Sequence, residues 1–115
     1  MARSNKPIIW GLFAAGGTVA AFVVPVLILI TCLGVPLGLV AGDVLSYERL
    51  LDLLQHAVSK LVTFVVLFLI LWHAAHRMRI TAHDLGIRND TIVAFVCYGI
   101  AAAGTLLMLA ALLNI

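Results

Sequence analysis

The stretch IIWGLFAAGGTVAAFVVPVLILITCL, residues 8–33, contains no charged side chain and decides the fold. An α-helix rises ~1.5 Å per residue and needs ~20 apolar residues to cross ~30 Å of hydrocarbon, so this run is long enough to span a bilayer. A second charge-free run extends from Thr91 to Ile115. The two runs therefore predict two membrane-spanning helices.

A third span is predicted between Lys60 and Arg77, where the apolar segment from Leu61 to His76 lies. As a helix this segment is ~24 Å long, slightly short of a full crossing. Lys60 can extend its ammonium group to the membrane surface while its aliphatic stem stays in lipid, so the helix can begin near His56. The middle segment thus completes a set of three spans.

The composition supports a membrane protein. Hydrophobic residues make up 64% of the 115-residue sequence and charged residues only 10%, with a mean hydropathy of +1.21. That leaves too little polar surface for a water-soluble globule. We expect one all-α transmembrane domain, residues 1–115, that forms a three-helix bundle in membrane lipid with approximate spans 8–33, 57–77 and 91–113. No nucleic-acid partner is expected.

The distribution of positive charge predicts the orientation of the bundle, because arginine and lysine are retained in cytoplasmic loops. Five cations fall on one side and two on the other: Arg3, Lys6, Arg77, Arg79 and Arg88 against Arg49 and Lys60. We therefore expect the N-terminus and the 77–90 turn in the cytoplasm. A cleaved signal peptide is disfavoured, because the first apolar run far exceeds the ~7–15 residues of a signal core.

Helix breakers and caps predict how the first span connects to the second. Pro25 removes one hydrogen bond and bends its helix, and the glycine and proline residues of LGVPLG, residues 33–38, predict the helix end. In GDVLSYERLLDLLQHAVSK, residues 42–60, apolar residues recur at helical spacing. Asp43 or Ser46 can cap the start of this segment. We expect a short interfacial helix that continues into the second span.

Small residues spaced four apart predict close contacts between helices. The pairs are Gly16 with Ala20, Gly17 with Ala21, and Gly99 with Ala103. Packing within the bundle explains any single pair, whereas the presence of two such seams also suggests contact with another subunit. Cys32 and Cys97 fall near opposite ends of their spans, too far apart for the ~6 Å Cα separation of a disulfide.

Polar chemistry gathers in WHAAHRMRITAHD, residues 72–84. If the helix continues through this segment, its polar residues fall near two adjacent faces, one with His73, Arg77, Ile80 and Asp84 and the other with His76, Arg79 and His83. Membrane topology alone is one explanation, because cytoplasmic arginines fix orientation. Haem ligation by His73 or His76 is another, but no other span supplies a second histidine.

A binding site for a flat polar ring is the third explanation of this cluster. Trp10 and Phe13 lie at the same predicted depth as the cluster, although an interfacial belt would also explain the tryptophan. Aromatic walls beside an arginine and a histidine suit a ring with carbonyl oxygens, because ring faces stack and the arginine donates hydrogen bonds to oxygen. A quinone has this chemistry.

Several function classes are disfavoured by the residues that the sequence lacks. No acidic residue and no lysine lies near the middle of a span, as an ion-coupled transporter or proton relay requires. The sequence contains no phosphate-binding glycine loop, no Cys-x-x-Cys metal motif and no nucleophile with an evident base. We therefore do not expect an enzyme that is complete on its own.

Short motifs follow one another in a specific order along the chain. They are WGLF at 10–13 followed by Gly16-Gly17, PLGL at 36–39, GDVLSYER at 42–49, LW at 71–72, HRM at 76–78 and HDL at 83–85. In this order and spacing, the sequence resembles the D subunit of the four-subunit bacterial fumarate reductase, one of its two hydrophobic membrane anchors. The similarity covers nearly the whole chain.

The resemblance implies a function that composition does not show. In that family a flavoprotein subunit with covalently attached FAD reduces fumarate, and an iron–sulfur subunit passes electrons to it. The C and D anchors hold both on the cytoplasmic face and form a menaquinol oxidation site at the subunit interface. By the family's motifs, the quinone-binding residues here would be Trp10, Phe13 and Arg77. His76 is a weaker candidate, taken from the polar cluster.

Two departures from the family pattern affect this site. Ile80 stands where the family has a histidine that lines the quinol site, and isoleucine cannot form that hydrogen bond. The contact is then lost or is taken over by His76 or Arg79. Ala14 stands where the pattern has glycine. A changed headgroup contact is the expected consequence.

The sequence thus predicts a non-catalytic anchor subunit of a quinol:fumarate reductase in the bacterial inner membrane. Its partners would be the C, iron–sulfur and flavoprotein subunits, and FAD and iron–sulfur clusters would belong to the partners alone. Two alternatives stay open at this point. One is a purely structural anchor without quinone contacts, and the other is a haem b-binding anchor of a succinate dehydrogenase-like complex, although haem is disfavoured.

Overall fold

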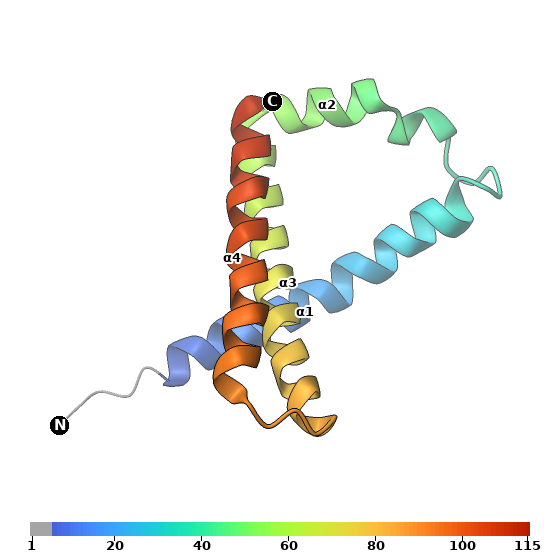
Figure 1. The fold of residues 1–115 in the computed structure, drawn as a ribbon. Helices are drawn as coiled ribbons and strands as arrows, with labels where there is room; N and C mark the ends of the chain where they lie inside the picture. Colours follow the sequence, from blue (N-terminus) through green and yellow to red (C-terminus); the bar gives the residue numbers. More distant parts are fainter. Residues whose placement is uncertain (1–5) are drawn as a thin grey trace.

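The computed structural model describes residues 6–115, and all regular secondary structure within that range is helical (Figure 1). Arg3, which contributed to the predicted orientation, lies outside the described residues. In chain order the elements are α1 (Lys6–Ile28), the π-helix η1 (Leu29–Gly34), the 3-10 helix η2 (Gly42–Leu45), α2 (Tyr47–Gln55), α3 (Ala57–Asp84) and α4 (Asp90–Asn114).

Three of these helical segments are long and apolar enough to cross a membrane. They are Lys6–Gly34, which joins α1 to η1, and the helices Ala57–Asp84 and Asp90–Asn114. The predicted all-α fold with three apolar helices is therefore confirmed. α3 extends beyond residue 77, so the whole polar cluster lies on one continuous helix, as the two-face prediction required. The orientation in the membrane stays a prediction.

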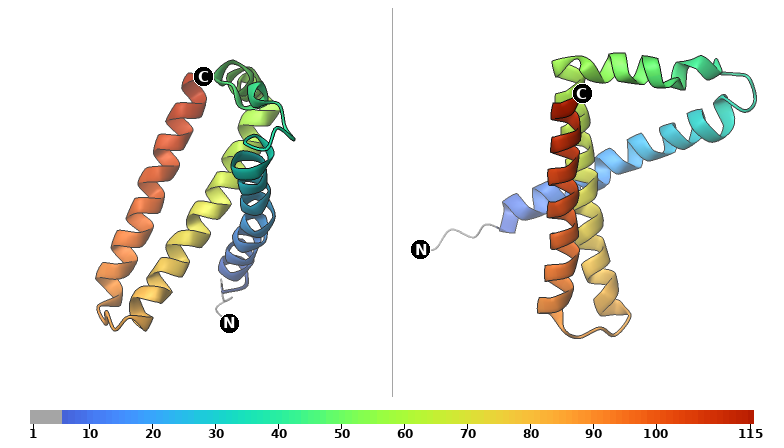
Figure 2. Two further views of the ribbon diagram at one scale, coloured as in Figure 1. Left: turned by 90° about the vertical axis from the view of Figure 1, so that its right-hand side faces the viewer. Right: turned by 45° about the horizontal axis from the view of Figure 1, so that its top comes forward.

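Helix α3 lies between the other two long helices (Figures 1 and 2). α4 runs antiparallel to it and alongside it, and the two are joined by the short turn after Asp84. α1 instead crosses α3 steeply, and its second half diverges from α3 toward the segment that leads to α2. α3 is therefore the central helix, and its contacts with α1 and α4 are about equally extensive.

The crossing of α1 over α3 depends on two glycines. A Cβ atom at Gly16 would overlap the backbone carbonyl oxygen of Leu69 and would lie 2.7 Å from Cβ of His73. A Cβ atom at Gly17 would lie 2.7 Å from Cε1 of His73. Because lipid is as apolar as a leucine side chain, membrane helices gain most from such close backbone approach. This predicted small-residue seam is used within the chain, whereas a Cβ atom at Gly99 would meet open space.

In its middle, the contact between α3 and α4 is built from small residues and a hydrogen bond between Trp72 and Thr105. The buried side chains include Ala75, Val93 and Ala101, and Gly104 makes room for Leu71. The indole N–H of Trp72 donates to the hydroxyl of Thr105 at 3.1 Å, and that hydroxyl donates to the carbonyl of Ala101 at 2.7 Å. The hydrogen bond fixes the indole plane beside α4.

Replacing Thr105 with valine should destabilise the pairing of α3 and α4 by about 1 kcal/mol. Valine keeps the shape but leaves the Trp72 N–H without its partner, which costs about the value of one hydrogen bond. Thr18→Val is a matched control, because that hydroxyl bonds only to Ala14 of its own helix and is exposed. Unfolding of the chain by SDS in mixed micelles would measure both, and equal effects would contradict the role assigned to Thr105.

The connection between the first two long helices differs in one detail from the sequence prediction. The first helix ends at Gly34 through the π-helix η1, within the predicted LGVPLG segment. Ser46 caps α2 by accepting from the backbone N–H of Arg49, so Ser46 rather than Asp43 is the cap; Asp43 forms an ion pair with Arg49 at 2.6 Å. α2 does not continue directly into α3, because His56 has an extended backbone (φ −71°, ψ 131°).

Both cysteines are free, as expected from their positions near opposite ends of their spans. The seam at Gly16 and Gly17 explains why this sequence has glycine at two consecutive positions of a long helix, where glycine otherwise costs helix stability. The functional consequence of the crossing is that the first turns of α1 are placed against the second half of α3. That region contains the predicted site.

Candidate functional site

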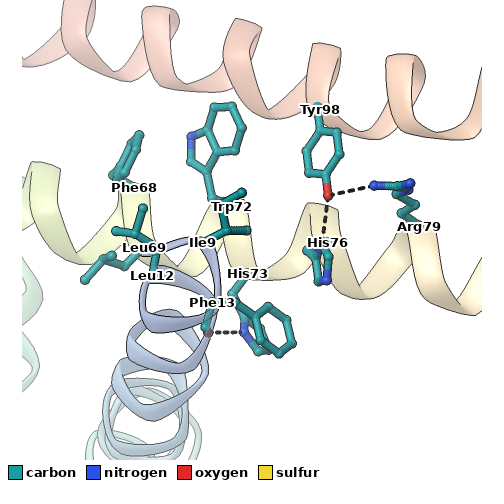
Figure 3. Close-up of a pocket in the computed structure, with 10 residues that line it drawn as sticks. All are labelled: Ile9, Leu12, Phe13, Phe68, Leu69, Trp72, His73, His76, Arg79 and Tyr98. Carbon is teal, nitrogen blue, oxygen red and sulfur yellow. Dashed lines mark hydrogen bonds between the residues drawn. The ribbon is translucent and has the colours of Figure 1, made fainter. Parts of the chain in front are cut away.

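A cavity of about 530 Å³ lies where the beginning of α1 meets α3 and α4 (Figure 3). Aromatic rings and aliphatic side chains form most of its wall, and polar groups gather toward the α3–α4 turn. Its lining residues are Ile9, Leu12, Phe13, Phe68, Leu69, Trp72, His73, His76, Arg79 and Tyr98. Volume and lining are those of a site for a small, largely apolar ligand with a few polar atoms.

Phe13 is the centre of the aromatic contacts at the mouth of the cavity. Its ring stacks on the imidazole of His73 at a centroid distance of 4.4 Å and meets His76 edge-on at 4.8 Å. Trp10, one turn earlier on α1, contacts the same ring edge-on at 5.7 Å. These edge and face arrangements are the favourable geometries of aromatic pairs. Phe13 therefore joins α1 to both histidines of α3.

His73 connects the two helices through a hydrogen bond as well as through stacking. Its Nδ1 lies 2.8 Å from the backbone carbonyl oxygen of Phe13. The absence of side chains at Gly16 and Gly17 lets the helix backbones approach closely enough for this bond. The close contact at the glycine seam therefore also holds His73 and Phe13, two residues of the cavity wall, in place.

The polar end of the cavity is a chain of hydrogen bonds between α3 and α4 (Figure 3). Nδ1 of His76 lies 2.7 Å from the hydroxyl oxygen of Tyr98, and Arg79 donates to that oxygen at 3.5 Å. Arg79 also forms a bidentate ion pair with the two carboxylate oxygens of Asp90, at 2.6 and 2.7 Å. Nε2 of His83 lies 2.8 Å from one oxygen of the same carboxylate. Arginine and carboxylate match in this bidentate geometry, which fixes the guanidinium plane.

The structure brings together three of the four predicted quinone-binding residues. Phe13 and His76 line the cavity, and Trp10 packs against Phe13 from outside the lining, with 67% of the residue exposed. Arg77 lies on the same helix as His76, but it is exposed and does not line the cavity. Within residues 6–115 it forms no hydrogen bond or ion pair, so its guanidinium is available to a ligand or another subunit.

Four lining residues that carry a polar group were not among the predicted site residues: Trp72, His73, Arg79 and Tyr98. For Arg79 the sequence did contain a usable signal, because helical spacing places it on the same face as His76. Tyr98 carried no such signal, because its partner His76 is on another helix. Of the two departures from the family pattern, neither Ile80 nor Ala14 lines the cavity.

The fold and the cavity define a small membrane protein whose three spanning helices enclose a ring-lined site at one end. Comparison with known proteins identifies the family of this chain. Residues 1–113 match the family described as the D subunit of fumarate reductase, and the chain belongs to this family. It is therefore a component of a fumarate reductase complex, with the other subunits as its partners.

Named relatives agree with this assignment. The chain is 40% identical over 99 residues to the fumarate reductase D subunit of Photobacterium profundum, covering 86% of this chain and 82% of that protein. It is 43% identical over 105 residues to the Mycobacterium tuberculosis protein of the same name, covering 90% and 82%. The Vibrio campbellii protein of that name is 37% identical over 99 residues, covering 86% and 79%.

Proposed function

We propose that this chain, with a second hydrophobic C subunit, anchors the flavoprotein and iron–sulfur subunits to the cytoplasmic face of the bacterial inner membrane and forms part of a menaquinol oxidation site. Membership of the D-subunit family supports the anchor role. The single observation that carries the quinol site is the cavity, whose wall combines aromatic rings with two histidines and an arginine. An apolar site with a few polar groups is what a quinol ring requires.

The chemistry of the lining supports a quinol rather than a purely apolar ligand. Phe13 and Trp72 offer ring faces for stacking, and His76 offers a nitrogen to a ring oxygen. Quinol oxidation releases two electrons and two protons, and the iron–sulfur subunit would receive the electrons. Arg77, which is exposed and follows the lining residue His76 in the sequence, would hold a ring oxygen and stabilise negative charge there. It cannot take up a proton, because arginine stays charged in proteins.

Replacing Arg77 with leucine tests the quinol site. We expect kcat/KM for quinol-linked fumarate reduction to fall about tenfold, the value of one hydrogen bond from a charged group. Fumarate reduction with a soluble dye as electron donor, and attachment of the complex to membranes, should be unchanged. Arg88→Leu removes another exposed arginine near the same turn and serves as the control.

Two outcomes would contradict this proposal. Unchanged quinol kinetics in Arg77→Leu and in variants of the cavity wall would favour a purely structural anchor. A Soret absorption band in the purified complex that is lost on replacing His73 or His76 would favour a haem-binding anchor instead.

A further inference from the structure

Both histidines of the cavity use Nδ1 for a hydrogen bond within the chain. Nε2 of each ring forms no hydrogen bond within residues 6–115, so it is the ring nitrogen left for a ligand. A neutral imidazole carries its hydrogen on only one nitrogen, and the bond made by Nδ1 therefore decides whether Nε2 donates or accepts. The partners of the two rings differ, and so should their tautomers.

The partner of His73 is a backbone carbonyl. The oxygen of Phe13 has no hydrogen and can only accept, so Nδ1 of His73 must carry the hydrogen in this 2.8 Å bond. Nε2 of neutral His73 is then a bare lone pair. His73 can accept a hydrogen bond, or a proton, from a ligand in the cavity.

The partner of His76 is the hydroxyl of Tyr98, which can either donate or accept a hydrogen bond. Its second hydrogen bond, with Arg79, determines which role the hydroxyl takes toward His76. The guanidinium only donates, and the oxygen of Tyr98 accepts from it at 3.5 Å. Among residues 6–115 the hydroxyl hydrogen of Tyr98 has one available acceptor, Nδ1 of His76 at 2.7 Å. A hydrogen on Nδ1 would leave the hydroxyl hydrogen unpaired in a half-buried site, at the cost of a hydrogen bond.

We propose that His73 and His76 are held as opposite neutral tautomers, so that the two lining histidines in contact with Phe13 present an acceptor and a donor. His73 would accept the hydrogen of a quinol hydroxyl, and His76 would donate to an oxygen of the ring. This inference rests on the proposed quinol site and adds His73 to it. Tyr98 and Arg79 are positioning residues, because they act on the ligand through His76.

The tautomers can be observed directly. In the complete complex, labelled with ¹⁵N-histidine and placed in lipid bilayers, solid-state NMR distinguishes protonated from bare ring nitrogens. Signals of the two residues are assigned by their loss in His73→Asn and His76→Asn. We expect a bare Nε2 for His73 and a bare Nδ1 for His76, and Tyr98→Phe should change only the second. Two identical tautomers, or two doubly protonated rings, would overturn the assignment.

The ligand contacts are tested by quinol kinetics with matched variants. The amide of His73→Asn can still donate to the carbonyl of Phe13 but has no acceptor at the position of Nε2, so quinol-linked kcat/KM should fall about tenfold. Tyr98→Phe should lower the same constant severalfold. Dye-linked fumarate reduction should be unchanged in both, and this activity should stay bound to the membranes, which shows that the complex has assembled.

The outcomes separate this inference from the proposed function. If Arg77→Leu impairs quinol turnover while His73→Asn and Tyr98→Phe do not, the quinol site stands and the donor–acceptor pair is wrong. If no variant of the cavity or of Arg77 changes quinol turnover, the proposed function fails. His73 and His76 then do not bind a quinol, even if NMR shows that their tautomers are opposite.

Discussion

Replacing Gly16 with alanine should destabilise the chain by about 1–3 kcal/mol, the usual range for forcing an extra methyl group into a packed contact. The new Cβ would overlap the carbonyl oxygen of Leu69, and neither helix backbone can move away without opening the crossing of α1 over α3. Because His73 reaches Phe13 only while the helices are this close, the cavity should be lost together with the contact.

Gly11→Ala is the matched control for this prediction. Gly11 lies on the same helix, but a Cβ atom there has no neighbour within 4 Å. Alanine is favoured over glycine inside a helix by about 1 kcal/mol, so this variant should be neutral or slightly stabilised. The fraction folded as a function of SDS, and the yield of four-subunit complex, would measure both variants. If the two glycines responded alike, the crossing would not depend on close backbone approach.

Replacing Phe13 with alanine should lower kcat/KM for quinol by about a hundredfold. The change removes the ring that contacts Trp10, His73 and His76, so both histidines lose a contact that positions them. A quinol ring also loses a stacking partner worth about 0.5–1.5 kcal/mol. The change also removes one wall of the cavity. Dye-linked fumarate reduction should persist, because the change is confined to the membrane subunit.

Phe22→Ala removes an equal side chain from the same helix and separates the site from general packing. Phe22 is 74% exposed and does not line the cavity. Quinol kinetics should be normal in this variant, measured in the same membranes. A comparable loss in both variants would mean that the cavity is not where the quinol ring binds.

The three spans were predictable because each is an uninterrupted apolar run, and a helix is the simplest element that satisfies its own backbone in lipid. The glycines at 16 and 17 indicated a close contact, but the sequence did not say with which helix. The steep crossing follows from the surface of α3 that receives them, Leu69 and His73, and no local pattern encodes such a pairing. The break at His56 was also not predicted, because neither glycine nor proline stands there.

Trp10, Phe13 and Arg77 were expected to meet in one pocket, but the cavity is lined by Phe13, His76 and Arg79 and not by Arg77. The sequence could not decide which arginine would join the cavity. Arg77 and Arg79 are two positions apart and point in nearly opposite directions on a helix. Sequence spacing fixes the angle between the two side chains around the helix, but not which of them faces the cavity. The rotation of α3 is fixed by contacts from other helices, with Asp90 and Tyr98 holding Arg79 and the glycine seam holding His73.

Helix α3 is long enough to reach the headgroups on both sides of a bilayer. Its 28 residues form a rod of about 42 Å, longer than the ~30 Å hydrocarbon layer. If Lys60 lies at one membrane surface, we expect the turn of α3 that carries Arg79 to reach the headgroups at the other. An anionic phosphate there would compete with Asp90 for the same guanidinium. The headgroup charge of the reconstituted bilayer is therefore an experimental variable that acts on His76 from outside the polypeptide.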